Sequence, residues 1–160
     1  MASQFPGSPK LLKGALAVYA FTSGCELGID VERLRPVLGM DDIAARFFCP
    51  EEIADLTALS PAEKPQGFFN CWARKEAYIK AIGDGLSVPL DSFRVSLQPG
   101  APAQLLHLDR SPVAAQGWTL HHFIPAQDHT GALAYHDRAR PLRRHAIMAA
   151  GELLDCLQTA

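Results

Sequence analysis

The middle of the chain contains the run Phe68-Phe69-Asn70-Cys71-Trp72-Ala73-Arg74-Lys75-Glu76-Ala77-Tyr78-Ile79-Lys80-Ala81-Ile82, followed by Gly83-Asp84-Gly85-Leu86. The run holds strong helix formers and no proline, and the spacing of its large apolar residues fits a period of 3.6 better than strict alternation. Gly83 and Gly85 supply a stop signal. The sequence therefore predicts one long helix over residues 68–82.

Charged residues fall on the apolar half of this predicted helix. At about 100° per residue that half is formed by Phe68, Phe69, Trp72, Ala73, Ile79 and Ile82. Lys75, Glu76 and Lys80 project into the same half. An uncompensated buried charge is costly, so these side chains need ionic partners: another side chain, a metal or an anionic ligand. A structural Glu76–Lys80 pair at i,i+4 is the alternative.

Two carboxylates stand close together near the beginning of the chain. In Leu27-Gly28-Ile29-Asp30-Val31-Glu32 the strand alternation sends Asp30 and Glu32 to the face opposite Ile29 and Val31. Two carboxylates in this arrangement usually lie on a strand face that is exposed to solvent. It becomes a metal site only if further oxygen ligands converge on it from elsewhere in the chain.

The remaining pattern predicts an α+β domain, because strands are followed by helices and then by a run of strands that favours an antiparallel sheet. The expected strands are 15–22, 27–32, 93–97, 103–108, 118–124 and 131–135, and the expected helices are 43–48, 50–59, 68–82 and 146–158. We expect a flexible tail over 1–14, a domain over 15–137, and a basic segment with a helix over 138–160.

Composition narrows the classes of function. The 160 residues carry a formal net charge of −2, which does not suggest nucleic acid as a partner. Cys25, Cys49, Cys71 and Cys156 form no C-x-x-C pair, which argues against a disulfide framework and a zinc site. The first apolar run is interrupted by Lys13, so neither a signal peptide nor a membrane span is expected. These features together favour a cytoplasmic protein.

Asp30, Glu32 and Glu76 would supply three oxygen ligands, and the lysines beside Glu76 could hold a phosphate, a set that suits Mg²⁺. Gly28-Ile29-Asp30-Val31-Glu32, then Trp72-Ala73-Arg74-Lys75-Glu76-Ala77-x-x-Lys80 and Gly83-x-Gly85-Leu86, resemble the signature of the 4′-phosphopantetheinyl transferases of the Sfp type. Phe47-Phe48-x-Pro50-x-Glu52 and Pro89-Leu90-x-x-Phe93 resemble further family positions. The resemblance covers residues 15–135 and is to the C-terminal half of that family.

The resemblance implies transfer of the phosphopantetheine arm of coenzyme A to a serine of an acyl or peptidyl carrier protein, which releases adenosine 3′,5′-bisphosphate. By the same resemblance, Asp30, Glu32 and Glu76 match the Mg²⁺ ligands. Lys75 and Lys80 match lysines at the coenzyme A pyrophosphate. Glu76 is the expected base for the acceptor serine, directly or through a water, and Lys80 is expected to assist the leaving phosphate.

The family's first half should precede Ala15, and its histidine for the coenzyme A 3′-phosphate has no counterpart in residues 1–14. Three explanations remain open: a truncated reading frame, a half that self-associates as a homodimer, or a remnant that binds coenzyme A or a carrier protein without catalysing. Some other Mg²⁺-dependent phosphate enzyme is a further alternative. Retention of all three carboxylates and both lysines favours chemistry over binding alone.

Overall fold

The computed structural model describes residues 16–83, 87–137 and 140–145. The tail predicted over 1–14, Gly85 of the predicted stop signal and the helix predicted over 146–158 lie outside these residues. In the part that is described, no helix is both long and apolar enough to cross a membrane.

The described elements follow the predicted order closely. In chain order they are β1 (Leu27–Arg33), α1 (Met40–Phe47), α2 (Pro50–Ala58), α3 (Lys64–Ile82), the 3₁₀ turn η2 (Leu90–Ser92), β2 (Phe93–Val95), β3 (Leu105–Leu108), α4 (Pro112–Ala115), β4 (Thr119–Phe123) and β5 (His129–Tyr135). The short helix α4 and the turn η2 were not predicted from the sequence. Gly83 caps α3 with a φ of 76°, a left-handed conformation that glycine adopts without strain.

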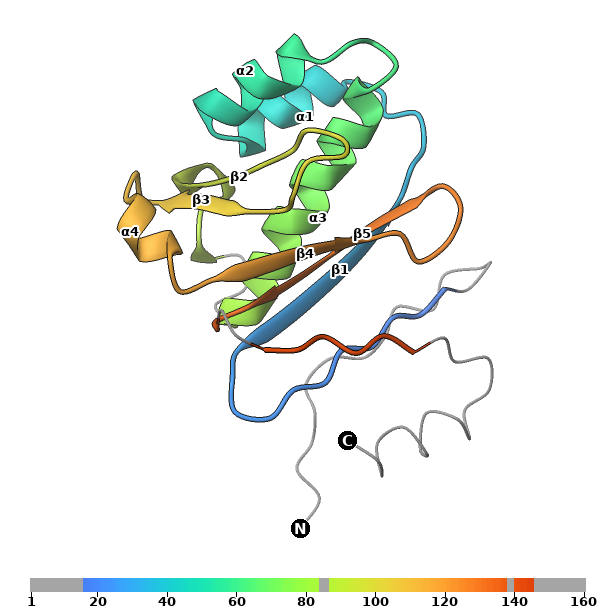
Figure 1. Cartoon of the computed structure of the whole chain (residues 1–160). Coiled ribbons are helices and arrows are strands. Elements are labelled where there is room, and N and C mark those ends of the chain that lie inside the picture. Colours follow the sequence, from blue (N-terminus) through green and yellow to red (C-terminus); the bar gives the residue numbers. More distant parts are fainter. Residues whose placement is uncertain (1–15, 84–86, 138–139, 146–160) are drawn as a thin grey trace.

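The fold is α+β, as predicted, with an antiparallel sheet packed against the long helix α3 (Figure 1). This sheet has the strand order β1-β5-β4, so the first and last strands of the domain pair directly. Asp30 faces Ala132 across the β1–β5 pair, and Glu32 faces Thr130. Because α3 contacts both β1 and β5, it lies across the sheet and fixes which residues of β1 meet the helix.

Helix α3 is packed on more sides than the sequence suggested. The predicted apolar half is largely buried, but Arg74, Ala77, Tyr78 and Ala81 on the opposite half are buried as well. The sheet covers one side of α3, and α1, α2 and the two-stranded sheet β2–β3 lie around the other (Figure 1). A helix enclosed in this way needs partners for its polar side chains on every face.

The strand predicted over 15–22 is wrong for the described residues, because 16–22 form neither a strand nor a helix. Leu16, Tyr19 and Phe21 are exposed, so little burial is available to stabilise a strand there. The segment is attached by a side chain instead, since Arg140 Nη1 donates to the carbonyl of Ser23 at 2.7 Å.

Candidate functional site

The predicted site begins with an ion pair between α3 and β1. The Lys80 ammonium lies 2.5 Å from Asp30 Oδ1, where it both donates a hydrogen bond and forms a salt bridge. The Asp30 side chain is only 10% exposed, whereas that of Lys80 is 48% exposed. The second oxygen, Asp30 Oδ2, is buried and has no hydrogen-bond partner. Lys80 therefore pairs with Asp30, fifty residues away, and not with Glu76 as the structural alternative supposed.

Gly28 explains how β1 comes so close to the helix. A Cβ atom on this residue would lie 2.0 Å from the carbonyl oxygen of Ala77 and 2.4 Å from the amide nitrogen of Ala81. Only glycine allows the two backbones to approach this closely. Gly28 and Asp30 share the buried face of β1 because side chains alternate along a strand. The close approach at Gly28 thus places the Asp30 carboxylate against the last turns of α3.

Glu32 and Glu76 complete a group of three carboxylates that repel one another. Burial raises the pKa of Glu76 first, and the charge of Asp30 raises it further, while Lys80 opposes the shift. Burial is also the main cause of the raised pKa of Glu32, with Asp30 next and Glu76 a smaller cause. The pKa of Asp30 is raised by burial despite its bond to Lys80. Folding therefore assembles more negative charge here than one lysine compensates.

These residues fit a divalent cation bound through oxygen. Mg²⁺ is held in proteins by a few carboxylates together with water and substrate phosphates. The buried Asp30 Oδ2 lacks a donor, and the nearby carboxylates Glu32 and Glu76 have raised pKa values although Arg35 lies 3.8 Å from Glu32 and Lys80 acts on both. The oxygens of the three carboxylates do not all lie within 4.8 Å of one another. Among the described residues, the group that meets this distance is Cys49, Glu51 and His107.

Lys75 does not occupy the position expected for a lysine at the coenzyme A pyrophosphate. Its side chain is 1% exposed, and Nζ lies 2.9 Å from Glu52 Oε2. Nζ also donates to the carbonyls of Leu90 at 2.6 Å and Phe93 at 2.7 Å, and lies over the Phe93 ring. In this structure the interior of the domain therefore encloses the Lys75 ammonium and supplies its partners.

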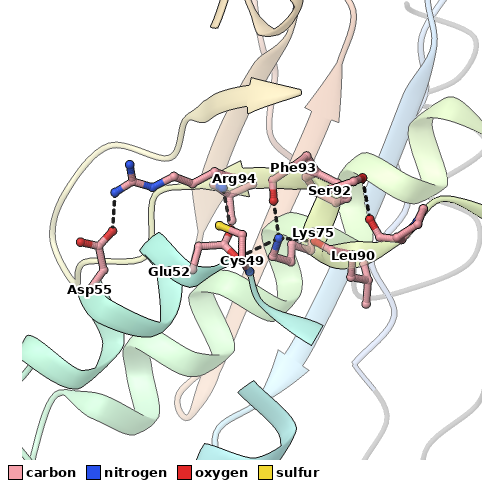
Figure 2. Close-up of polar contacts among 10 residues, drawn as sticks. Cys49, Glu52, Asp55, Lys75, Leu90, Ser92, Phe93 and Arg94 are labelled. Atoms are coloured by element: carbon pink, nitrogen blue, oxygen red, sulfur yellow. Dashed lines mark hydrogen bonds and ion pairs between the residues drawn. The ribbon is translucent and has the colours of Figure 1, made fainter. Parts of the chain in front are cut away.

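Glu52 is the partner that sequence reasoning missed, because its pattern was noted without any prediction of what its carboxylate contacts. The structure turns its carboxylate inward, where the backbone amides of Cys49 and Val95 donate to it at 2.9 and 2.8 Å. Figure 2 shows Glu52 beside Cys49 and Lys75. The available sequence signal was the pattern Phe47-Phe48-x-Pro50-x-Glu52, which resembles family positions. This network ties α2 and β2 to the helix that carries Glu76.

Comparison with known proteins places the chain in a family. The family model described as the 4′-phosphopantetheinyl transferase superfamily matches residues 26–134. A 4′-phosphopantetheinyl transferase named HetI from Nostoc is 36% identical over 119 residues, which cover 74% of this chain and 47% of that protein. The transferase Sfp from Bacillus subtilis is 43% identical over 84 residues, covering 52% of this chain and 36% of Sfp.

Two solved structures share the fold. The Thermotoga maritima holo-[acyl-carrier-protein] synthase aligns with a TM-score of 0.55 at 18% identity, over 72% of this chain and 66% of that one. An acyl-carrier-protein synthase in complex with coenzyme A, from Chronobacterium ammoniagenes, aligns with a TM-score of 0.51 at 18% identity, over 74% of this chain and 100% of that one. The chain spans less than half the length of the curated relatives named above. With more than half of its residues matched by the family model, the chain belongs to the 4′-phosphopantetheinyl transferase superfamily, among relatives of the Sfp and HetI type.

Proposed function

We propose that this chain carries the Mg²⁺-dependent chemistry of a 4′-phosphopantetheinyl transferase, moving the phosphopantetheine arm of coenzyme A to a serine of an acyl or peptidyl carrier protein. One observation supports this most directly: Gly28 brings Asp30 against Glu76 and Lys80, and leaves Asp30 Oδ2 buried without a donor. A domain without a cationic ligand gains nothing from this arrangement, since the buried Oδ2 without a partner lowers its stability.

The proposed reaction is a phosphoryl-type transfer. The serine oxygen of the carrier protein attacks the phosphorus next to the pantetheine arm, so that a new P–O bond forms. The bond from that phosphorus to the oxygen bridging the two phosphates breaks, and adenosine 3′,5′-bisphosphate leaves with the electron pair. The serine proton passes to Glu76, directly or through a water. A carboxylate whose pKa is raised by burial and by Asp30 accepts a proton more readily than an ordinary glutamate.

Asp30, Glu32 and Glu76 would hold the metal. When bound, Mg²⁺ neutralises charge on the pyrophosphate and on the leaving phosphate. The chain's own residues then orient the reactants: Gly28 fixes Asp30 relative to α3, and the buried Lys75–Glu52 pair fixes α3 relative to α2.

Lys80 is the residue best placed to bind a phosphate directly. It is about half exposed and lies at the carboxylate group, so its ammonium can contact an arriving pyrophosphate while remaining near Asp30. It would stabilise the negative charge that develops on the leaving oxygen. This role separates Lys80 from Lys75, although both belong to one sequence motif.

A second candidate function is a binding module that holds coenzyme A or a carrier protein without transfer. We also propose that the chain forms a homodimer. Tyr19 and Phe21 stack with ring centroids 6.5 Å apart and are each about half exposed, which leaves apolar surface for a second copy.

The test is the intact mass of a carrier protein after incubation with the full chain, coenzyme A and Mg²⁺. The unchanged chain is compared with Glu76→Gln, Lys80→Met and the control Lys64→Met, since Lys64 pairs with Asp41 away from the site. We expect the carrier to gain one phosphopantetheine with the unchanged chain and the control. We expect a loss of at least about a hundredfold in rate with the other two variants.

The two candidate functions give different results. Coenzyme A or carrier binding without any mass increase, by a folded chain and over several carriers, would replace the transferase with the binding module. Full turnover by Glu76→Gln would remove Glu76 from both its proposed roles. Light scattering on the same preparations measures whether activity follows a dimer.

A further inference from the structure

Three potential metal ligands converge at the beginning of α2, away from the carboxylates of the proposed transferase site. Cys49 Sγ, a Glu51 carboxylate oxygen and a ring nitrogen of His107 all lie within 4.8 Å of one another. They come from two distant parts of the chain: Cys49 and Glu51 begin α2, and His107 belongs to β3. A thiol, a carboxylate and an imidazole are the ligand types that zinc sites combine.

His107 is the independent observation that points to a ligand. Both of its ring nitrogens are buried, and neither has a hydrogen-bond partner. A neutral imidazole carries one donor and one acceptor, and buried polar atoms in proteins are nearly always paired. A bound cation at one nitrogen would satisfy one of the two atoms that the protein leaves unpaired.

There is room for an ion and its water beside these side chains. A pocket of about 470 Å³ is lined by all three residues and also by Asp91, Asp109 and Arg110. Two of these additional residues are carboxylates, so the lining adds net negative charge. Among the lining residues, Cys49 is 2% exposed and Glu51 is exposed, so the pocket has both a buried and a solvent-facing ligand.

We propose that Cys49, Glu51 and His107 bind a divalent cation of the zinc class, distinct from the Mg²⁺ of the transferase site. On binding, the Cys49 thiol loses its proton to solvent and a sulfur–metal bond forms. The thiolate and the Glu51 carboxylate then balance the two positive charges, and neutral His107 is the third ligand. Three protein ligands leave a fourth position for water, which is the pattern of an open zinc site.

The ion would join α2 to β3 at a structurally sensitive point. Cys49 is the N-cap of α2, and its backbone amide donates to Glu52, the buried partner of Lys75 (Figure 2). Metal binding at Cys49 would therefore hold in place the network that positions α3. We expect zinc to raise the thermal unfolding temperature, because a ligand that binds only the folded chain stabilises it.

The experiment uses Co²⁺ as a spectroscopic substitute for zinc, added to the metal-free full chain in excess Mg²⁺. Mg²⁺ occupies the oxygen ligands of the transferase site, and a cobalt–thiolate charge-transfer band reports sulfur ligation alone. The variants are Cys49→Ser and His107→Gln, with Cys25→Ser and His129→Gln as controls. Serine is a preferred N-cap residue, so Cys49→Ser keeps the cap of α2 while it removes the thiolate. Circular dichroism verifies that each variant folds.

We expect one equivalent of Co²⁺ to produce the band, one equivalent of Zn²⁺ to remove it, and the two control variants to behave like the unchanged chain. Cys49→Ser and His107→Gln should lose the band, and Glu51→Gln should weaken zinc binding about tenfold or more, equivalent to about 1.4 kcal/mol. Absence of the band in the unchanged chain, or its persistence in folded Cys49→Ser or His107→Gln, would overturn the proposal. Neither result depends on whether the chain transfers phosphopantetheine.

Discussion

Lys80 and Asp30 are fifty residues apart in sequence, yet Lys80 Nζ lies 2.5 Å from Asp30 Oδ1 and leaves Oδ2 of the same carboxylate without a partner. The pair connects the last turns of α3 with the middle of β1. One oxygen is held by a cation of the protein, and the other is buried without a hydrogen-bond partner. This division makes Asp30 the residue that joins the fold to the proposed chemistry.

The two lysines of the motif should respond differently to the same substitution. Lys75→Met leaves Glu52 charged and buried without its cation, which typically costs about 3–5 kcal/mol. Lys80→Met removes a half-exposed cation but leaves the mostly buried Asp30 carboxylate without its partner, so we expect a smaller loss of about 1–3 kcal/mol together with the loss of transfer. Urea unfolding of both variants, beside the transfer assay, measures the difference. Equal stability of the two variants would show that the Lys75–Glu52 pair does not hold the fold.

Removing a carboxylate from the proposed metal site should stabilise the metal-free chain. The pKa of Glu76 is raised, so folding favours its protonated form. Its contribution to stability is therefore greatest below the ordinary pKa of 4.5 and is lost as the pH rises through the higher folded value. At pH 7 in a chelator, Glu76→Gln should be more stable by about 0.5–1 kcal/mol.

The check for this prediction is thermal unfolding from pH 4 to 8 with and without Mg²⁺. The advantage of Glu76→Gln over the unchanged chain should shrink as the pH falls toward about 4.5. It should also shrink or reverse when Mg²⁺ is added, because the ion stabilises only the intact set of carboxylates. A variant that is less stable than the unchanged chain in chelator at pH 7 would contradict the raised pKa.

Gly28→Ala should strongly destabilise the domain. The added methyl group would meet backbone atoms of Ala77 and Ala81 at 2.0 and 2.4 Å, and backbone cannot rotate away as a side chain can. We expect a loss of about 3 kcal/mol or more. Gly100→Ala is the matched control: its φ is 77° and nothing lies within 4 Å, so it should cost only about 1 kcal/mol of backbone strain. Denaturant unfolding that ranks the two variants in the opposite order would exclude close packing at Gly28.

Arg74→Met should leave the chain equally or more stable. Arg74 is 1% exposed, and burial lowers its pKa to about 10 from 12.5. Because the pKa of Arg74 is lower in the folded chain, folding disfavours its charged form. At pH 7 this lowers the free energy of unfolding by at most about 3 kcal/mol. Two hydrogen bonds that Arg74 Nη1 donates to Ser96 offset part of this cost, whereas Arg74 Nε has no hydrogen-bond partner.

Urea unfolding measures the Arg74→Met variant, with the exposed Arg46→Met as a control expected within about 0.5 kcal/mol of the unchanged chain. A loss of more than about 2 kcal/mol at position 74 would show that its bonds to Ser96 outweigh the cost of the buried charge. Ser96 keeps partners either way, because it donates to the carbonyl of Pro102 and accepts from the amide of Gln104.

Local patterns predicted α3 and most of the strands correctly, because periodicity and a glycine cap act within a few residues. The same reasoning failed at residues 16–22, whose apolar composition suits a strand but whose described side chains are not buried by a neighbour. It also treated residues 74, 77, 78 and 81 as lying away from the packed half, although the structure buries them. Projection onto a single helix cannot show that other elements cover it on a second side.

The chemistry of the site divides in the same way. The sequence alone determined the fold class, the family resemblance and the choice of Asp30, Glu32, Glu76 and Lys80, because a motif preserves residue types at fixed spacing. Only the tertiary structure decided which lysine side chain is accessible to solvent. Lys75 is enclosed with Glu52, whereas Lys80 is half exposed. It also brought His107 to Cys49 and Glu51. These contacts depend on how β3 and α2 pack against each other. A local sequence pattern does not predict which distant segments bury each other.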